Sequence, residues 1–150
     1  AHEQSCVTHR HYRSQACCAL YCLWAFNELH RRPDPWNSAV ETLRAIYGEG
    51  NFYRIELEER ILPARNDPPR GTGYVVDCLW SARHACGEKD YASIVRRAVS
   101  LGMDTDTTAC VAGGIAGLRH GFRSIPEDWV EGLRGKEDVD PLAKALVEGR

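Results

Sequence analysis

Residues 102–117 place two carboxylates and three hydroxyls directly before a run of small apolar residues. The polar part is Asp-Thr-Asp-Thr-Thr at 104–108, and residues 109–117 behind it carry no charge. This pattern predicts a helix with clustered oxygen atoms at its N-terminus. Each glycine in a helix interior costs roughly 1 kcal/mol relative to alanine, so the three glycines at 113, 114 and 117 predict a closely packed neighbouring backbone. The apolar run is too short to span a membrane, so we expect a central buried helix of an all-helical protein.

The oxygen atoms of Asp104, Asp106 and Thr107 predict a site for a hard cation, because carboxylates and hydroxyls suit Mg²⁺, Mn²⁺ or Ca²⁺. Residues i and i+2 of a regular helix point about 200° apart. The two acids can therefore converge only if Asp104 is the N-cap and Asp106 lies in the first turn, with Thr107 on the same side. The alternative is plain N-capping by Asp104, favoured by the helix dipole, with no metal. The residues alone leave both interpretations open.

Helical patterns dominate the rest of the chain, and strand-like alternation is nearly absent. Residues 14–29 are apolar on all sides, which is typical of a fully buried helix that Pro33 and Pro35 end. The clearest loop is 63–73, with two adjacent prolines and a Gly-Thr-Gly sequence. We expect further helices over about 38–48 (capped by residue 37 or 38), 51–62, 74–85, 91–101, 104–120, 126–133 and 141–147, the last after a charged linker at 135–140.

Composition limits the classes of protein to which the chain can belong. The 150 residues suit one domain or part of one, and 19 basic against 21 acidic residues argue against a nucleic-acid platform. No signal peptide or membrane span is recognisable. The seven cysteines are odd in number and lie in helical patterns, so we expect reduced thiols that fill the core rather than disulfides or a zinc site. This predicts a reducing, cytoplasmic compartment.

Four segments in order resemble the C-terminal half of the ADP-ribosylglycohydrolase family. They are residues 8–11 (Thr-His-Arg-His), 72–79 (Thr-Gly-Tyr-Val-Val-Asp-Cys-Leu), 97–108 (Arg-Ala-Val-Ser-Leu-Gly-Met-Asp-Thr-Asp-Thr-Thr) and 125–129 (Ile-Pro-Glu-Asp-Trp). The resemblance covers about residues 6–134. It implies an all-α fold, the C-terminal portion of the family's orthogonal multi-helix bundle, with residues 1–150 forming a single helical domain or a domain fragment.

The resemblance also implies an activity, a cofactor and site residues. The family uses two divalent metals, usually Mg²⁺ or Mn²⁺, to hydrolyse the glycosidic bond between ADP-ribose and a protein side chain. Asp104, Asp106 and Thr107 match its C-terminal metal ligands, His9 matches a histidine near ADP-ribose, and Gly73 and Tyr74 match a loop against the adenosine. From the residues alone, Tyr74 can equally be an aromatic packed on its own fold, and His9 can simply cap the adjoining helix.

Two departures from the family pattern concern the metal site. The family's other metal ligands, a Thr-Asp-Asp set, and its acidic base lie in an N-terminal half, and this chain has no Thr-Asp-Asp. Met103 also stands where the family usually has glycine. Three protein ligands cannot fill two six-coordinate sites, so we expect weak Mg²⁺ binding.

The chain thus resembles half of an active site, and the catalytic group is expected in an N-terminal part. That part was cut away, is supplied by another chain, or was lost in a truncated homologue; a chain that begins at Ala1 suits a fragment. Exposed apolar surface then predicts association with an N-terminal companion chain or with a second copy. The competing hypothesis is a catalytically inert binding or structural module of the same fold. Asp77, one turn after the adenosine loop, is expected to be a solvated helical acid; the alternative is a hydrogen-bond acceptor that supports the site from behind.

Overall fold

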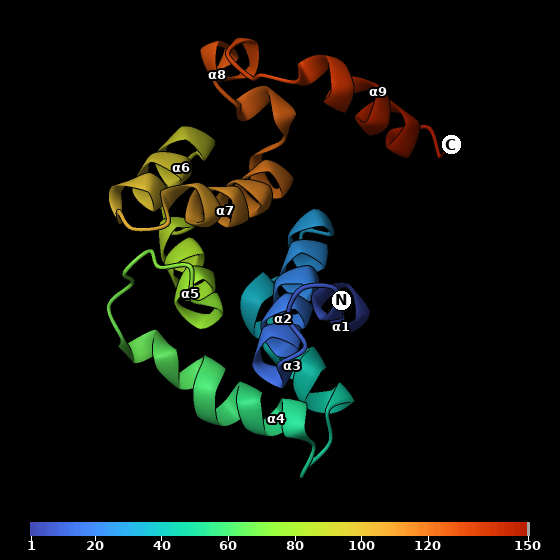
Figure 1. Ribbon diagram of the computed structural model, residues 1–150, viewed down its shortest axis with the longest axis vertical. Helices are drawn as coiled ribbons and strands as arrows, with labels where there is room; N and C mark the ends of the chain where they lie inside the picture. The colour runs from blue at the N-terminus through green and yellow to red at the C-terminus, as the bar shows by residue number, and fades with distance from the viewer. Residues whose placement is uncertain (150) are drawn as a thin grey trace.

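The computed structural model describes residues 1–149, which form helices and loops without any strand (Figure 1). In chain order the elements are α1 (His2–Cys6), α2 (Tyr12–Leu29), α3 (Pro35–Ile46), α4 (Phe52–Glu56), the π-helical η1 (Leu57–Ile61), the 3₁₀ helix η2 (Leu62–Asn66), α5 (Val75–Ala85), α6 (Tyr91–Ser100), α7 (Thr105–His120), the 3₁₀ helix η3 (Phe122–Ser124), α8 (Glu127–Glu131) and α9 (Lys136–Val147). The predicted all-α class is confirmed. No helix within residues 1–149 is long and apolar enough to cross a membrane.

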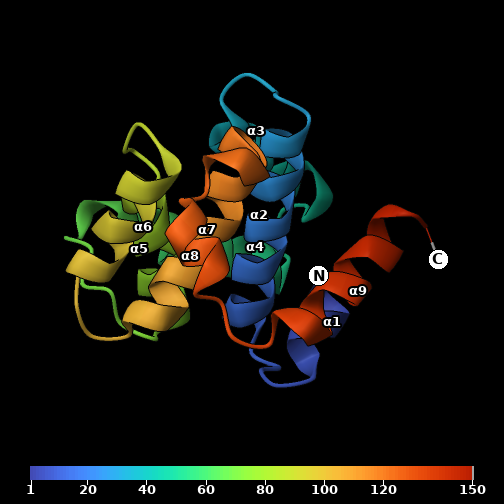
Figure 2. The same cartoon turned by 90° about the horizontal axis from the view of Figure 1, so that it is seen from above.

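Helix α2 lies at the centre of the molecule. It contacts α3, α5 and α7, and α6 packs along α7 on the other side (Figures 1 and 2). The core between these helices buries mostly aliphatic side chains and two tryptophans: Leu20, Trp24, Trp36, Leu43, Leu57, Ile61, Leu79, Ile94 and Ile115. Helices α8 and α9 extend beyond this bundle, and α9 has no buried residue. The fold therefore consists of a packed body, residues 2–124, with a C-terminal extension.

The sequence-based expectation for α2 is partly wrong. Ala16, Leu20 and Trp24 are almost completely buried, but Phe26 is 45% exposed and Cys22 also faces solvent. Only one side of the helix is covered by α3, α5 and α7. Helix α2 therefore carries apolar side chains on every side, but some of those side chains remain exposed to solvent.

The start of α3 also differs from the expectation. Asp34, rather than residue 37 or 38, is the N-cap, and its Oδ1 accepts a hydrogen bond from the Asn37 N–H at 3.4 Å. Pro35 begins the helix instead of ending the previous one, because the first helical turn needs no N–H donor at that position. The chain segments 2–6, 62–66 and 136–140 are likewise helical where no helix was expected.

Helix α7 has the predicted bounds, but only one of its faces is buried. Ala112, Ile115 and Ala116 are fully buried, whereas Gly114 lies on the exposed side. A Cβ atom at Gly114 would lie 2.5 Å from the Tyr21 hydroxyl oxygen, and one at Gly117 would meet nothing within 4 Å. Gly114 thus makes room for a side-chain hydroxyl, Gly117 faces open space, and neither meets a neighbouring backbone, which corrects the expectation.

All seven cysteines, which lie within the described residues, are free thiols. Cys17, Cys78 and Cys86 are buried, and burial raises the pKa of each thiol, that of Cys86 to about 12. These three are the small hydrophobic core residues that the sequence predicted. Cys22 and Cys110 are exposed and fill no core.

Candidate functional site

Asp104 is placed at the start of α7 by a tight turn. Gly102 and Met103 both have positive φ angles, +77° and +58°, and the turn directs the Asp104 N–H to the Gly71 carbonyl at 2.8 Å. Asp104 is the N-cap of α7, but its carboxylate accepts no capping hydrogen bond of good geometry. The Thr107 N–H, the donor that an N-cap side chain ordinarily binds, contributes only weakly to this carboxylate, so its oxygen atoms remain largely available to a ligand.

The side chains of Asp104, Asp106 and Thr107 lie close together. The pKa of Asp104 is lowered, chiefly by hydrogen bonding with the Thr107 hydroxyl, against the opposing effect of partial burial; Asp106 and the Thr107 N–H contribute less. Asp104 is half-buried, and the other two are exposed. Two carboxylates and one hydroxyl thus gather at the solvent-facing end of α7.

This trio supplies only part of a metal coordination sphere. Within residues 1–149 no group of three or more His, Cys, Asp or Glu side chains is arranged to hold a metal ion. The oxygen atoms present are hard ligands of the type that Mg²⁺ and Mn²⁺ prefer. The chemistry of the donors fits such a cation, and their number leaves most coordination positions to water or to groups outside this chain.

Gly71 and Gly73 bring the loop before α5 into contact with the trio. A Cβ at Gly71, which has φ of +68°, would lie 2.8 Å from the Gly102 carbonyl oxygen. A Cβ at Gly73 would collide with Oδ2 of Asp104. Gly71 therefore needs glycine, and a side chain at position 73 would force Asp104 or the loop to move, so the loop and the acidic trio are in direct contact.

The loop is held in this position by α5 itself. Asp77 accepts hydrogen bonds from the Thr72 N–H and hydroxyl at 2.7 Å each and from the Arg70 N–H at 3.2 Å. The Gly71 N–H donates to the buried Ser81 hydroxyl at 3.0 Å. Asp77 is only 10% exposed at its side chain. The expectation of a solvated helical acid is therefore wrong, because the adjacent loop folds back over it.

Tyr74 is the N-cap residue of α5, and its side chain is about half exposed. Its hydroxyl oxygen accepts a hydrogen bond from Arg13 Nη1 at 2.8 Å, and Arg13 forms an ion pair with Glu56 at 2.7 Å. The ring is thus fixed at its hydroxyl end while much of its surface stays open to solvent. Sequence reasoning missed Arg13, since a single arginine near the start of an apolar helix carries no local signal.

His9 lies apart from these residues in the hydrogen-bond network of residues 1–149. It occupies the exposed segment between α1 and α2, where its Nδ1 pairs with the Thr8 hydroxyl at 3.0 Å. His11, not His9, caps α2, with its Nδ1 accepting from the Arg13 N–H at 3.1 Å. The structure therefore brings Gly73 against Asp104, beside Asp106 and Thr107. Tyr74 follows Gly73 along the chain and its side chain pairs with Arg13, whereas His9 has no hydrogen bond to any of these residues within residues 1–149.

Comparison with known proteins gives a consistent picture. The family model for ADP-ribosylglycohydrolase matches residues 1–150. The ADP-ribosylarginine hydrolase Tri1 of Serratia proteamaculans is 35% identical over 83 residues, 55% of this chain and 23% of that protein. Tri1 of Pseudomonas putida is 28% identical over 97% of this chain and 38% of its own length. Human ADP-ribosylhydrolase ARH3 is 48% identical over 48 residues, 32% of this chain and 13% of that protein.

The chain thus spans well under half the length of these relatives. No solved structure matches it.

Proposed function

Because this chain belongs to the ADP-ribosylglycohydrolase family, we propose that it carries the C-terminal share of the active site of a hydrolase that releases ADP-ribose from modified protein side chains. One observation supports this most: the Asp104, Asp106 and Thr107 side chains meet at the start of α7, and the glycine loop packs against them. Plain helix capping explains the weak contribution of the Thr107 N–H, but it does not explain why the glycine loop packs against Asp104.

In this proposal Asp104, Asp106 and Thr107 hold Mg²⁺ or Mn²⁺. The bound metal would supply Lewis-acid chemistry and orient the distal ribose hydroxyls and a water molecule. The chain's own contribution is to keep the Asp104 and Asp106 side chains beside the Thr107 hydroxyl. Hydrogen bonding with Thr107 lowers the pKa of Asp104 and so favours its charged form, which is the form that binds a cation.

The loop at Gly73 and Tyr74 would contact the adenosine part of ADP-ribose in this proposal. The half-exposed Tyr74 ring offers a stacking surface, and its hydrogen bond to Arg13 fixes the direction in which it points. Lack of a side chain at Gly73 lets a ligand come close to the backbone beside Asp104. His9 would lie near the ADP-ribose only if the ligand reaches the segment before α2.

We further propose that the catalytic base and the remaining metal ligands lie in an N-terminal companion segment or chain, or in a second copy. Large apolar side chains that such a partner would cover are exposed, among them Phe52 at 65% and Phe122 at 71%. In this proposal the chain resides in the cytoplasm, because that compartment is reducing and keeps cysteines as free thiols, as all seven are here. We expect no nucleic acid among the partners, because the net charge is −2, and no membrane, because the apolar run at 109–117 is too short to span one.

Calorimetric titration of the chain with Mn²⁺, followed by ADP-ribose, tests the metal assignment. We expect Asp104→Asn to weaken Mn²⁺ binding at least about tenfold, since one charged ligand is lost. Asp138→Asn, an exposed acid in the first turn of α9, is the matched control and should bind like the unmodified chain. Equal Mn²⁺ affinity in all three proteins would refute the assignment.

A catalytically inert module is the second candidate, and the absence of a Thr-Asp-Asp sequence favours it. An arginine-linked ADP-ribosyl peptide, incubated with the chain and Mg²⁺, separates the two. Binding of the peptide without release of ADP-ribose supports the inert module or a missing half-site. Release by this chain alone excludes both, and release only after an N-terminal segment is added supports the divided site.

A further inference from the structure

Arg83 is a half-buried cation with no counter-charge. Four arginines within residues 1–149 are half-buried, and three of them form ion pairs with carboxylates: Arg13 with Glu56, and Arg44 and Arg54 with Glu58. Arg83 forms neither an ion pair nor a hydrogen bond in this part of the chain, although Asp34 acts on it from beyond ion-pair distance. Partly buried charges are normally paired, so this exception calls for a partner.

Two tryptophans hold the Arg83 guanidinium in place. Its Cζ lies 4.4 Å from the ring centroid of Trp36 and 5.7 Å from that of Trp80. Such stacking attracts the cation through the ring faces but leaves its five N–H donors without acceptors. The guanidinium is therefore positioned and desolvated while its hydrogen-bonding capacity remains open to a ligand.

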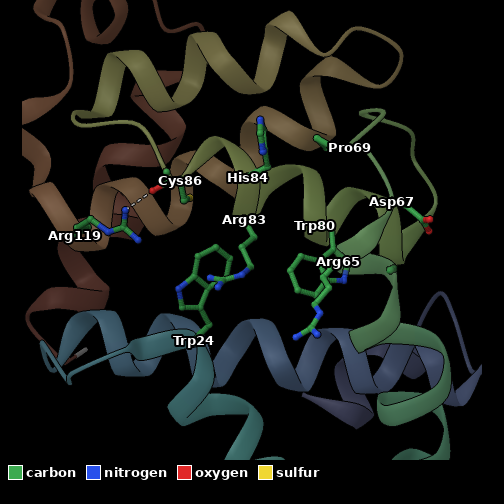
Figure 3. A pocket seen from close by; sticks show the side chains of 11 residues that line it. Trp24, Arg65, Asp67, Pro69, Trp80, Arg83, His84, Cys86 and Arg119 are labelled. Atoms are coloured by element: carbon green, nitrogen blue, oxygen red, sulfur yellow. Dashed lines mark hydrogen bonds between the residues drawn. The ribbon is translucent and has the colours of Figure 1, made fainter.

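A cavity of about 380 Å³ adjoins this guanidinium (Figure 3). Its lining includes three arginines (Arg65, Arg83 and Arg119) against one carboxylate, Asp67. Trp24 and Trp80 give it aromatic surface. A ligand that enters it therefore meets a positive and partly apolar environment.

Arg119 contributes charge to this cavity but few free donors. It is bound to Glu28 at 2.6 Å and to the Cys86 carbonyl at 2.6 Å, the contact drawn in Figure 3. The donors free to bind a ligand are therefore mainly those of Arg83 and the exposed Arg65.

We propose that this cavity is a binding site for a small oxyanion, with phosphate the chemistry that fits best. Its oxygen atoms would accept paired hydrogen bonds from the Arg83 guanidinium, the geometry for which arginine is suited. Glu28 balances the charge of Arg119, so one net positive charge remains among Arg65, Arg83 and Asp67, and a bound oxyanion would balance it. This site is separate from the Asp104 site and does not depend on the proposed hydrolase function.

The hollow on the other side of Trp80 is a poorer place for an anion. It measures about 800 Å³ and shares Arg65, Trp80 and Arg83 with the first cavity. Glu41 and Glu58 also line it together with Arg44, which pairs with both, so two carboxylates offset its positive charge where the first cavity has only Asp67 in its lining. The proposal therefore places the anion on the Trp24 side of Arg83.

Heteronuclear NMR of the indole and arginine Nε–H groups tests the proposal. Phosphate is titrated into the chain at constant ionic strength, with acetate and chloride as parallel titrants. We expect saturable shifts at Arg83, Trp24 and Trp80, with phosphate binding more tightly than acetate and chloride producing no saturation. The Trp129 signal, from α8, should stay unchanged. Shifts that do not saturate, or that are equal for all three anions, would overturn the proposal.

Two variants assign the binding to Arg83. Arg83→Gln should weaken phosphate binding at least about tenfold, the loss expected when charge-assisted hydrogen bonds are removed. Arg83→Lys keeps the charge but not the paired donors, so it should bind phosphate more weakly than the unmodified chain and more tightly than Arg83→Gln. Arg134→Gln, an exposed arginine after α8, is the control and should change nothing. Arg83→Lys is the variant closest to native packing. If it and a folded Arg83→Gln both bind phosphate as tightly as the unmodified chain, the assignment is overturned.

Discussion

The backbone of Gly73 lies directly against the carboxylate of Asp104, although Gly73 belongs to the loop before α5 and Asp104 is the N-cap of α7. The Asp104 N–H also donates to the Gly71 carbonyl, so two contacts fix the loop before α5 to the start of α7. Neither contact follows from sequence spacing. The loop and the acidic trio therefore move as one body, and a change in the loop should be felt at the carboxylates.

Replacing Gly73 by alanine tests this coupling. The new Cβ would occupy the position of the Asp104 carboxylate, so the loop or the acid must shift. We expect Gly73→Ala to weaken Mn²⁺ binding about tenfold and to lower the free energy of unfolding by about 1–3 kcal/mol, measured by calorimetry and urea unfolding. Gly117→Ala is the matched control in α7, where a Cβ meets nothing within 4 Å. It should leave Mn²⁺ binding unchanged and stabilise the chain by up to about 1 kcal/mol.

Met103 carries backbone strain that glycine would relieve. It adopts φ of +58° while its side chain is 78% exposed, so little packing is lost when the side chain is removed. A left-handed conformation costs an ordinary residue about 1 kcal/mol or more relative to glycine. Met103→Gly should therefore raise the free energy of unfolding by about 1 kcal/mol in urea unfolding. Met103→Ala keeps the Cβ and should give no such gain; an equal gain from both variants would show that the side chain, not the backbone, is strained.

Asp77 should make stability depend on acid pH. Burial alone would raise its pKa, but the hydrogen bonds from Thr72 and Arg70 outweigh this effect and lower it. The folded-state pKa thus lies below the unfolded value of about 3.9, so the stabilisation is complete above that pH and is lost as the pH falls through the lowered folded-state pKa.

Asp77→Asn removes this titration and part of the hydrogen bonding. We expect a loss of about 2 kcal/mol at pH 7, and the difference from the unmodified chain should shrink as the pH drops from about 4 to 2. Urea unfolding at several pH values measures both quantities. Asp138→Asn, at an exposed acid, should follow the unmodified curve throughout. A difference for Asp77→Asn that stays constant with pH would mean that the carboxylate charge is not responsible.

Local patterns in the sequence were enough to predict most of the helices and the position of Asp104 at the start of α7, while metal binding by the acidic trio stays a prediction. The bounds of α7 follow from its uniform small residues after Asp104, and periodicity located most of the other helices. The long-range contacts were not predictable in this way. Arg13 reaches Tyr74 across 61 positions, and burial of Asp77 depends on a loop that folds back over α5. Such pairs form because helices that are distant in the sequence pack together, and the pattern of neighbouring residues in one sequence does not show which helices will do so.

Glu28 and Arg119 join the ends of α2 and α7 through a mostly buried ion pair. Glu28 Oε1 accepts from Arg119 Nη2 at 2.6 Å and from the Trp24 indole N–H at 3.0 Å, with the Glu28 side chain 7% exposed. Arg119→Leu would leave this carboxylate without its cation, which destabilises far more than the pair itself stabilises. Because Arg119 is one-third exposed, we expect a loss of about 2–3 kcal/mol, near the lower end for buried pairs.

The double variant distinguishes an unpaired charge from lost packing. Glu28→Gln keeps an acceptor for Trp24 but carries no charge, so alone it should cost about 1 kcal/mol. In the Arg119→Leu background the same change should restore stability, because no buried carboxylate is then left alone. The free energy of unfolding of Glu28→Gln/Arg119→Leu in urea should therefore exceed that of Arg119→Leu. If the two single losses simply add, the cost of Arg119→Leu comes from the arginine side chain's packing, and the ion pair between α2 and α7 contributes little.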